Sequence, residues 1–449
     1  MTIKQGLIIF LCLQLLLITA SCSSSNNQRL PADFGETPSG NLVLYLEPYS
    51  LLENVLPIFQ TIYPDVELDL RYFDSAEEYQ AVIQNEMLTE HGPDLILFSP
   101  WMFKNIYKVM ESGAFLDLEP LFEKDGSIHW EDYQKAVMDT GLYKDKRYVV
   151  PLDYCLPLLV TTEEILSENS LDLAELDNFQ TFTLEIEKYL QTHPENPVIF
   201  SDTLRNPMNF HYYLWSSGIQ LVDYKEGTYD IFNSDFRNVL EKYKAIYPQV
   251  YRKPMELLSD EYYASSYDGI LDLRRKQAVF SNHISLSTSA MTTLSGLTST
   301  TSPVLFTMPD LNGGVTATAD LMVGIPATSR NKNAAFALVK MLLQQTGQTN
   351  DSLHNIPVLK LSSELRWELE SDMYSDAYDL QEDIYFEEPS KKNMAEYEDI
   401  LRRVDVCQIE NRELDTKVMD TLIPYFEDSM TLDECLQRLD NMLLLYLSE

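Results

Sequence analysis

The residue types that perform catalysis do not form a recognisable arrangement in this sequence. There is no glycine-rich phosphate loop followed by lysine and serine or threonine, and no nucleophile elbow. The six histidines are scattered, no two are spaced for a zinc-binding helix, and no segment matches a calcium loop. The 70 Asp and Glu residues make acidic pairs so common that none identifies a catalytic dyad. We therefore expect no enzyme activity, no metal and no cofactor, with a hydrolase of dispersed catalytic residues as an alternative.

Aromatic and carboxylate side chains do occur where two apolar segments end. Leu42–Leu46 and Leu95–Phe98 are continuous apolar runs, as expected of strands that are buried on both faces. Glu47-Pro48-Tyr49 follows the first run, and the second leads from Phe98 to Trp101. Ligands of parallel sheets bind beyond the carboxyl ends of the strands. The sequence therefore predicts that these two loops line a binding site.

The segments between these runs predict the elements that position them. Ser50 with Glu53, and Ser75 with Glu78, have the spacing of a capping box, and apolar residues at helical spacing follow each pair. Pro57 predicts a kink in the first helix. A strand of alternating pattern, 66–72, lies between the two helices. This βαβαβ order predicts an α/β fold with a parallel sheet and helices on its faces.

Later segments are less regular. We expect extended segments at 147–152 and 156–160, on either side of Asp153-Tyr154-Cys155, and helices near 236–247 and 332–343. The segment 285–303 is rich in serine and threonine. We expect it to be a mobile loop, with a polar wall of the ligand site as the alternative.

The N-terminus has the pattern of an export signal. An apolar run from Gly6 to Ile18 is too short to span a bilayer comfortably, and small residues follow it directly before Cys22. This resembles a bacterial lipoprotein signal, although Thr19 stands where a leucine is usual. The resemblance implies removal of 1–21, a lipid on Cys22 and a flexible tether over 22–40. An ordinary signal peptide and a retained membrane anchor are the alternatives.

The formal charge of -37 argues against binding to nucleic acid or to anionic lipid. Its simplest consequence is solubility, and a cationic ligand is the alternative. Because protonation relieves repulsion between acidic groups, we expect little loss of melting temperature from pH 7 to about 5. The five cysteines form no disulfide framework, so we expect Cys407 and Cys435 to be free, with a pairing between them as the alternative.

Several segments, in order along the chain, resemble the family of extracellular solute-binding proteins that includes maltose-binding protein. They are Gly92-Pro93-Asp94 with the following apolar run, 133–152, Phe232-Asn233-Ser234, 321–343 with Gly324-Ile325-Pro326, and the ending 425–449. The resemblance implies an α/β fold of two lobes, each a mostly parallel sheet flanked by helices, joined by hinge strands that close around a ligand. We expect 41–150 and 288–316 in lobe 1, and 156–284 and 320–449 in lobe 2.

The resemblance also implies which residues contact the ligand. Phe98 stands where the family often has an aromatic ring that stacks on a sugar, and Trp101 lies close by in the sequence; a structural role in the core is the alternative for each. Asp153 stands at the hinge position where a carboxylate binds hydroxyls, with a structural carboxylate as the alternative. The full set of expected contacts is Glu47, Tyr49, Phe98, Trp101, Asp153, Tyr154, Asn209 and Asp320. For Trp215 and His283 we expect structural roles.

The resemblance therefore implies a lipid-anchored receptor on the outer face of the bacterial cell membrane. We expect it to be a monomer that captures a mono- or oligosaccharide and delivers it to the membrane subunits of an ABC importer. The first loop lacks the tryptophan that is common in sugar binders, so a non-sugar solute is an alternative. A surface adhesin or sensor module is a second alternative, from another functional class.

Overall fold

The computed structural model describes residues 31, 34–46, 50–193, 199–201, 209–250, 268–283, 289–350, 352–353, 355–362 and 385–448. The chain divides into two units, Met1–Glu36 and Thr37–Glu449. In the first unit, the backbone N–H of Phe34 donates to the carbonyl oxygen of Pro31. The expected lipidation residue Cys22 and the expected ligand contacts Glu47 and Tyr49 lie outside the described residues.

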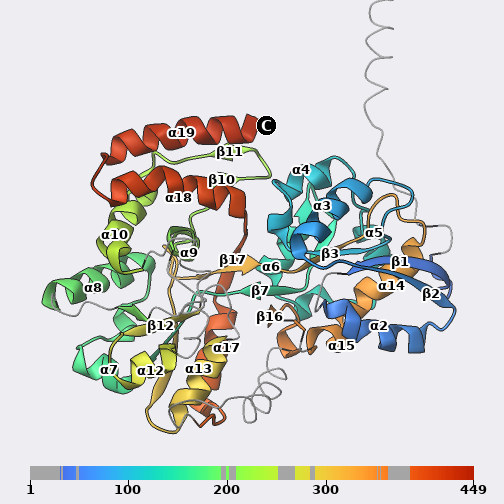
Figure 1. The fold of residues 1–449 in the computed structure, drawn as a ribbon. Coiled ribbons are helices and arrows are strands. Elements are labelled where there is room, and N and C mark those ends of the chain that lie inside the picture. The colour runs from blue at the N-terminus through green and yellow to red at the C-terminus, as the bar shows by residue number, and fades with distance from the viewer. Residues whose placement is uncertain are drawn as a thin grey trace, which may run out of the picture. The chain divides into compact units, whose positions relative to one another are not determined.

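The second unit is an α/β structure that begins with the expected βαβαβ order (Figure 1). Strands β1 (Gly40–Leu46) and β2 (Val66–Tyr72) pair in parallel, and α2 (Leu51–Ile62) and α3 (Ala76–Glu86) connect the strands. The hydroxyl of Ser50 accepts from the N–H of Leu52, and that of Ser75 accepts from the N–H of Glu78, so both predicted serines begin helices. Helix α2 continues through Pro57.

The rest of lobe 1 consists of a three-stranded sheet of order β3-β15-β6 and the elements around it. Strand β15 is antiparallel to both neighbours and returns to this lobe from a distant part of the sequence. These elements are β3 (Ile96–Phe98), η1 (Pro100–Met102), α4 (Ile106–Glu111), α5 (Glu119–Asp125), η2 (Trp130–Asp132), α6 (Lys135–Met138), η3 (Asp139–Gly141), β4 (Leu142–Tyr143), β5 (Lys146–Arg147), β6 (Val149–Pro151), β15 (Met322–Gly324), α14 (Lys332–Leu343) and α15 (Gln345–Gln348).

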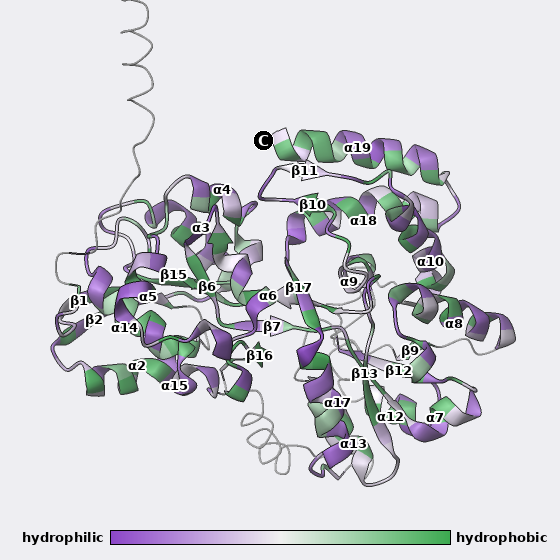
Figure 2. Ribbon diagram, turned by 180° about the vertical axis from the view of Figure 1, so that it is seen from behind, coloured by the Kyte–Doolittle hydropathy of each residue, from purple (hydrophilic) through white to green (hydrophobic). Residues whose placement is uncertain are grey.

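Lobe 2 is built on a four-stranded sheet of order β13-β8-β12-β9. Its strands are β8 (Leu158–Thr162), β9 (Phe200–Ser201), β12 (Phe280–His283) and β13 (Pro303–Thr307), with the hairpin β10 (Val222–Asp223) and β11 (Thr228–Tyr229). Its helices are α7 (Glu163–Glu168), η4 (Leu173–Glu175), α8 (Phe179–Thr192), α9 (Phe210–Ser216), α10 (Ser234–Val250), α12 (Asp268–Arg274), α13 (Ser289–Thr298), α17 (Lys391–Arg402), α18 (Arg412–Phe426) and α19 (Leu432–Ser448). Figure 2 shows hydrophobic and hydrophilic residues alternating around these helices, as burial of one face requires.

A third sheet carries the crossings between the lobes. Its order is β16 (Ile356–Pro357), β7 (Asp153–Cys155), β14 (Val315–Ala319) and β17 (Val404–Ile409). Strands β14 and β17 are parallel, so their carboxyl ends, which lead to Asp320 and to Glu410, lie at the same edge of the sheet.

The expected grouping of 288–316 with lobe 1 is wrong. Strand β13 pairs along its whole length with β8 of lobe 2, whereas β15, which we expected in lobe 2, pairs with β3 and β6 of lobe 1. The expected mobile loop at 285–303 is also corrected for its described part. Residues 289–298 form α13, because Ala290, Leu294 and Leu297 recur at helical spacing and are fully buried.

Candidate functional site

Asp320 brings three distant segments together at the edge of the crossover sheet. It directly follows β14, and its carboxylate accepts two side-chain hydrogen bonds. The Ser99 hydroxyl, just beyond β3, donates to Oδ1 at 3.3 Å, and Asn355 Nδ2 donates to Oδ2 at 2.8 Å. The carboxylate is thereby fixed in orientation while it remains partly exposed.

Trp101 lies in η1, next to Ser99, and its ring faces a cation. The guanidinium carbon of Arg412 is 4.0 Å from the ring centroid, a cation–π contact. Arg412 Nε also donates to Glu410 Oε1 at 2.9 Å. The Arg412 side chain is 58% exposed and that of Glu410 is 16% exposed, so the pair is reachable from solvent.

The Glu410 carboxyl interacts electrostatically with both Arg412 and Asp320. Burial raises the pKa of the Glu410 carboxyl, the Arg412 guanidinium opposes the rise, and the charge of Asp320 adds to it. Burial also raises the pKa of the Asp415 carboxyl, and the charge of Glu410 adds to that rise. The Arg412 guanidinium therefore interacts with the carboxyl groups of Glu410 and Asp415, and Asp320 interacts with Glu410.

Helix α9 contributes a neutral histidine. Burial lowers the pKa of His211 to about 3, and the positive charge of Arg412 contributes to the decrease. The imidazole lies 5.2 Å from the ring of Trp215, which is itself buried. Asn209, which was expected to contact the ligand, is the N-cap residue of the same helix and precedes His211 by two residues. At neutral pH the imidazole is uncharged and offers one donor and one acceptor.

We use "polar–aromatic cluster" for the residues that these contacts and charges connect. Its members are Ser99, Trp101, His211, Asp320, Asn355, Glu410 and Arg412. Of the eight residues expected from the sequence, Trp101 and Asp320 belong to it. The sequence analysis missed Glu410 and Arg412, although they follow the strand β17 and the rule of strand ends that identified Trp101 applies to them as well.

Two expected residues lie inside the protein. Phe98 has no exposed surface, and its ring centroid is 5.1 Å from that of Phe103 and 5.9 Å from that of Phe115. Asp153 is 2% exposed, and its Oδ1 accepts from the backbone N–H of Leu321 at 2.8 Å. Phe98 thus occupies an aromatic core, and Asp153 fastens β7 to the residue that follows Asp320.

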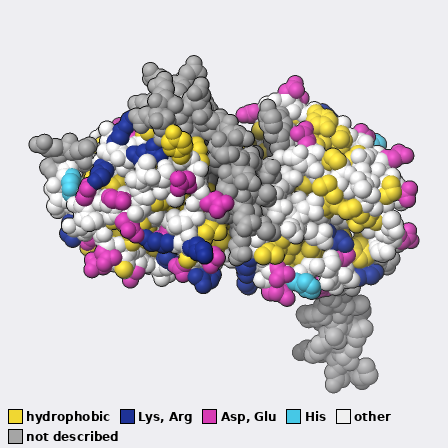
Figure 3. Space-filling view, turned by 90° about the horizontal axis from the view of Figure 1, so that it is seen from below, with side chains coloured by type: hydrophobic (Ala, Val, Ile, Leu, Met, Phe, Trp, Pro, Cys, Tyr) yellow, Lys and Arg dark blue, Asp and Glu magenta, His cyan; other side chains and the backbone are white. Residues whose placement is uncertain are grey.

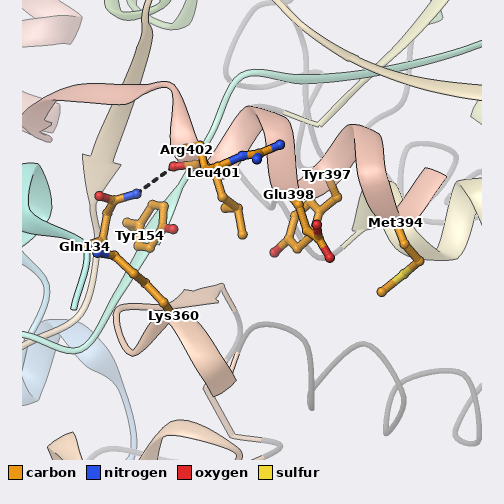
Figure 4. Close-up of a pocket in the computed structure, with 8 residues that line it drawn as sticks. All are labelled: Gln134, Tyr154, Lys360, Met394, Tyr397, Glu398, Leu401 and Arg402. Carbon is orange, nitrogen blue, oxygen red and sulfur yellow. Dashed lines mark hydrogen bonds between the residues drawn. The ribbon is translucent and has the colours of Figure 1, made fainter. Parts of the chain in front are cut away.

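Tyr154, the next expected residue, lines a pocket of about 350 Å³ beside α17 (Figure 4). This volume is at the lower end of the range for small-molecule sites. Gln134 Nε2 donates to the carbonyl oxygen of Leu401 across one end of the pocket, at 2.8 Å. Burial raises the pKa of Tyr154, so the phenol is a neutral donor. The other lining residues are Lys360, Met394, Tyr397, Glu398 and Arg402.

The described part of the chain bears on the expectations for metal ligands, disulfides and membrane spans. Within it, no three His, Cys, Asp or Glu side chains are grouped to hold a metal ion. Cys407 and Cys435 are free, as expected, so the alternative of a pairing between them is wrong. Within the same residues, no helix has the length and apolar character of a membrane span.

Solved structures share this fold, whereas no protein-family model and no curated protein matches the sequence. The sugar-binding protein MalE from Xanthomonas citri is 14% identical, with a TM-score of 0.67, over 91% of this chain and 98% of that one. The ABC substrate-binding protein Lmo0181 from Listeria monocytogenes, solved in complex with cycloalternan, is 12% identical, with a TM-score of 0.59 over 90% and 98%.

A third structure is an ABC transporter solute-binding protein from Thermotoga lettingae, bound with α-D-tagatose. It is 14% identical, with a TM-score of 0.58 over 91% of this chain and 100% of that one. At this level of identity the likeness establishes the fold. The chain therefore has the two-lobed α/β fold of extracellular solute-binding proteins, and the expected two-lobed α/β class and structural resemblance are confirmed. The expectation of a mostly parallel sheet in each lobe is wrong, because β15 is antiparallel to β3 and β6, and β8 is antiparallel to β12 and β13.

Proposed function

We propose that this protein is an extracellular solute-binding protein that captures a mono- or oligosaccharide between its lobes for an ABC importer. The observation that carries the proposal is the fold. About nine-tenths of the chain superposes on almost the whole of proteins that are described as sugar-binding or were solved with a sugar bound. Such a protein needs binding without catalysis, and we expect it to act as a monomer.

The polar–aromatic cluster has the chemistry that this function requires. An aromatic ring covers the apolar face of a sugar, while fixed polar groups bind its hydroxyls. Trp101 supplies the ring, and Asp320, Glu410 and Arg412 supply charged acceptors and donors from the crossover edge. Because Arg412 covers the Trp101 ring in this structure, a sugar that stacks there displaces or shares the guanidinium. Phe98, which has no exposed surface, is not part of the proposed site.

We further propose that the protein is exported and anchored by a lipid on Cys22, with 22–40 as a tether. The pattern of apolar run, small residues and cysteine supports this part of the proposal. A tether of this length holds a folded unit close to a membrane without embedding it. The membrane subunits of the importer are then within reach.

A thermal-shift screen followed by calorimetric titration tests the proposal. A solute that binds only the folded form raises the melting temperature by mass action. The library contains neutral sugars together with amino sugars and polyamines, since the carboxyl groups of Glu410 and Asp415 interact with the Arg412 guanidinium and that of Asp320 interacts with Glu410. Binding of a saccharide supports the proposal, and binding of a polyamine alone identifies a non-sugar solute. If no solute binds, the adhesin or sensor module takes precedence.

Trp101→Ala locates the site once a sugar is found. Loss of a stacking ring and its buried area is expected to weaken binding about tenfold or more, while the melting temperature of the free protein changes little. Trp130→Phe is the matched control, because Trp130 packs on Arg147 and Phe122 of lobe 1. Equal affinity of the Trp101→Ala variant and the parent would exclude the polar–aromatic cluster as the sugar site.

A further inference from the structure

The outer end of α4 meets the end of α19, although the two helices belong to different lobes (Figures 1 and 2). Helix α4 is fixed within lobe 1, because Lys144, beside β4, forms an ion pair with Glu111 at 2.6 Å. Helix α19 is fixed within lobe 2, because Tyr229 of the hairpin donates to Asp440 Oδ1 at 2.7 Å. Contacts between these two helices therefore connect the lobes outside the crossover sheet.

The backbone carbonyl of Lys104 is the centre of these contacts. Asn411 Nδ2 donates to it at 2.8 Å, and the Tyr446 hydroxyl donates to it at 3.2 Å. The Lys104 ammonium lies 4.7 Å from the centroid of the Tyr446 ring. Tyr446 is only 4% exposed, so these contacts are largely shielded from water. Asn411 also accepts from the N–H of Leu414 as the N-cap of α18, which fixes its side chain.

Two lysine contacts extend the connection on either side. Lys108 Nζ of α4 donates to the carbonyl oxygen of Leu447 at 3.4 Å, near the end of α19. Lys225, in the turn between β10 and β11, lies with its ammonium 5.1 Å from the centroid of the Tyr107 ring. Burial raises the pKa of Tyr107, and the charge of Asp223 on β10 adds to the rise.

These contacts adjoin the polar–aromatic cluster. Asn411 is the residue between Glu410 and Arg412, and Lys104 is three residues beyond Trp101. Asp320 directly follows β14 of the crossover sheet, Arg412 covers the Trp101 ring, and the Lys104 carbonyl accepts from Asn411 and Tyr446. A sugar bound on Trp101 would have the crossover sheet on one side and these interlobe contacts on the other.

We propose that Lys104, Tyr107 and Lys108 form a latch with Asn411, Tyr446, Leu447 and Lys225, which holds the lobes closed and slows the exit of the bound sugar. The latch rests on the proposed function for its ligand, but the contacts themselves exist independently of any ligand. Each is a modest interaction, a hydrogen bond or a cation–π contact between described residues. Because they act together across one boundary, the loss of one is expected to loosen the boundary without unfolding either lobe.

Hydrogen exchange of Tyr446→Phe tests the latch without a ligand. This change removes the hydroxyl that bonds to the Lys104 carbonyl and to the Asn411 side chain, and it keeps the ring. Faster exchange is expected in 104–111 of lobe 1 as well as in the last turn of α19. Leu445→Ala is the control, because Leu445 is 63% exposed on the same helix turn. Faster exchange confined to α19 would overturn the latch, since it would show a contact that matters only within lobe 2.

Sugar dissociation provides the second readout. In Tyr446→Phe and in Lys225→Ala, the dissociation rate of the sugar found by the screen is expected to rise about three- to tenfold, the effect of one lost hydrogen bond or cation–π contact. Lys188→Ala, a surface lysine on α8, is the control. Unchanged dissociation rates in both variants would overturn the role in sugar retention. If no sugar is found, the proposed function fails, and the exchange experiment still decides whether the latch exists.

Discussion

At the scale of single residues, the structure separates side chains that hold the fold from those that can reach a ligand. Asp153 was expected to bind hydroxyls, but its carboxylate is buried and fastens the backbone at Leu321. Trp101 and Arg412 instead present a ring and a guanidinium with exposed surface. Asp320 can both hold the fold and reach a ligand, because its two oxygens accept hydrogen bonds while its side chain remains partly exposed.

Asp153→Ala should therefore destabilise the protein. It leaves the N–H of Leu321 without its acceptor in a buried place, which costs about 1–3 kcal/mol of unfolding free energy. Asp153→Asn keeps an oxygen acceptor and should cost much less. Urea denaturation of the two variants measures the difference. Equal stability of Asp153→Ala and the parent would show that the hydrogen bond to Leu321 contributes nothing, and would return Asp153 to the list of ligand contacts.

At the scale of elements, local signals in the sequence were reliable and long-range pairing was not. Ser50 and Ser75 mark helix starts because the capping interaction lies within three residues. The lobe of β13 was assigned wrongly, because a short, mostly apolar strand carries no mark that distinguishes a place beside β8 from a place in lobe 1. The sequence allows Phe98 to be either a ligand contact or a core residue, because its packing against Phe103 and Phe115 is decided only when the chain has folded.

Asp94, the last residue of the Gly-Pro-Asp segment, connects strand β1 to the residues ahead of helix α14. Its carboxylate accepts from the N–H of Val43 in β1, and from Ser329 Oγ and the N–H groups of Arg330 and Asn331 ahead of α14. Asp94→Ala leaves several buried donors unpaired, so a loss of at least about 3 kcal/mol of unfolding free energy is expected. Asp94→Asn keeps the oxygen that accepts three of the four bonds and should lose less. Denaturant titration decides; equal losses in the two variants would contradict this role.

At the scale of the whole molecule, the charge of -37 is not gathered in one patch on the face seen in Figure 3, where Asp and Glu side chains are interspersed with Lys and Arg.

Export and anchoring also belong to this scale. Cys22→Ser removes the thiol that would carry the lipid. The variant should appear in the medium or remain unprocessed, as cell fractionation and mass measurement would show. A variant that is processed and anchored like the parent would contradict the lipoprotein signal.

Stability against pH depends on two histidines that the charge count does not reveal, the buried His283 and the partly exposed His211. Burial lowers the pKa of His283 from 6.5 to about 3, and burial and Arg412 lower that of His211 to about 3. Between these values the unfolded chain binds protons that the folded chain does not, so stability falls as the pH drops below about 6.5. The raised pKa values of Glu410 and Asp415 act in the opposite direction, because the folded state takes up those protons more readily.

Because of the histidines, we now expect the protein to lose stability between pH 6.5 and 5, in place of the small change expected from charge alone. His283 is 3% exposed, held between the hydroxyls of Ser281 and Ser289, and contributes about 2 kcal/mol to the loss over this interval. Denaturant titrations of the parent and of His283→Asn at pH 7, 6 and 5 measure it. The variant starts from a lower stability at pH 7 but should fall less steeply. Parallel curves for the two proteins would show that His283 takes up its proton equally in the folded and unfolded states, and would contradict its contribution to the loss.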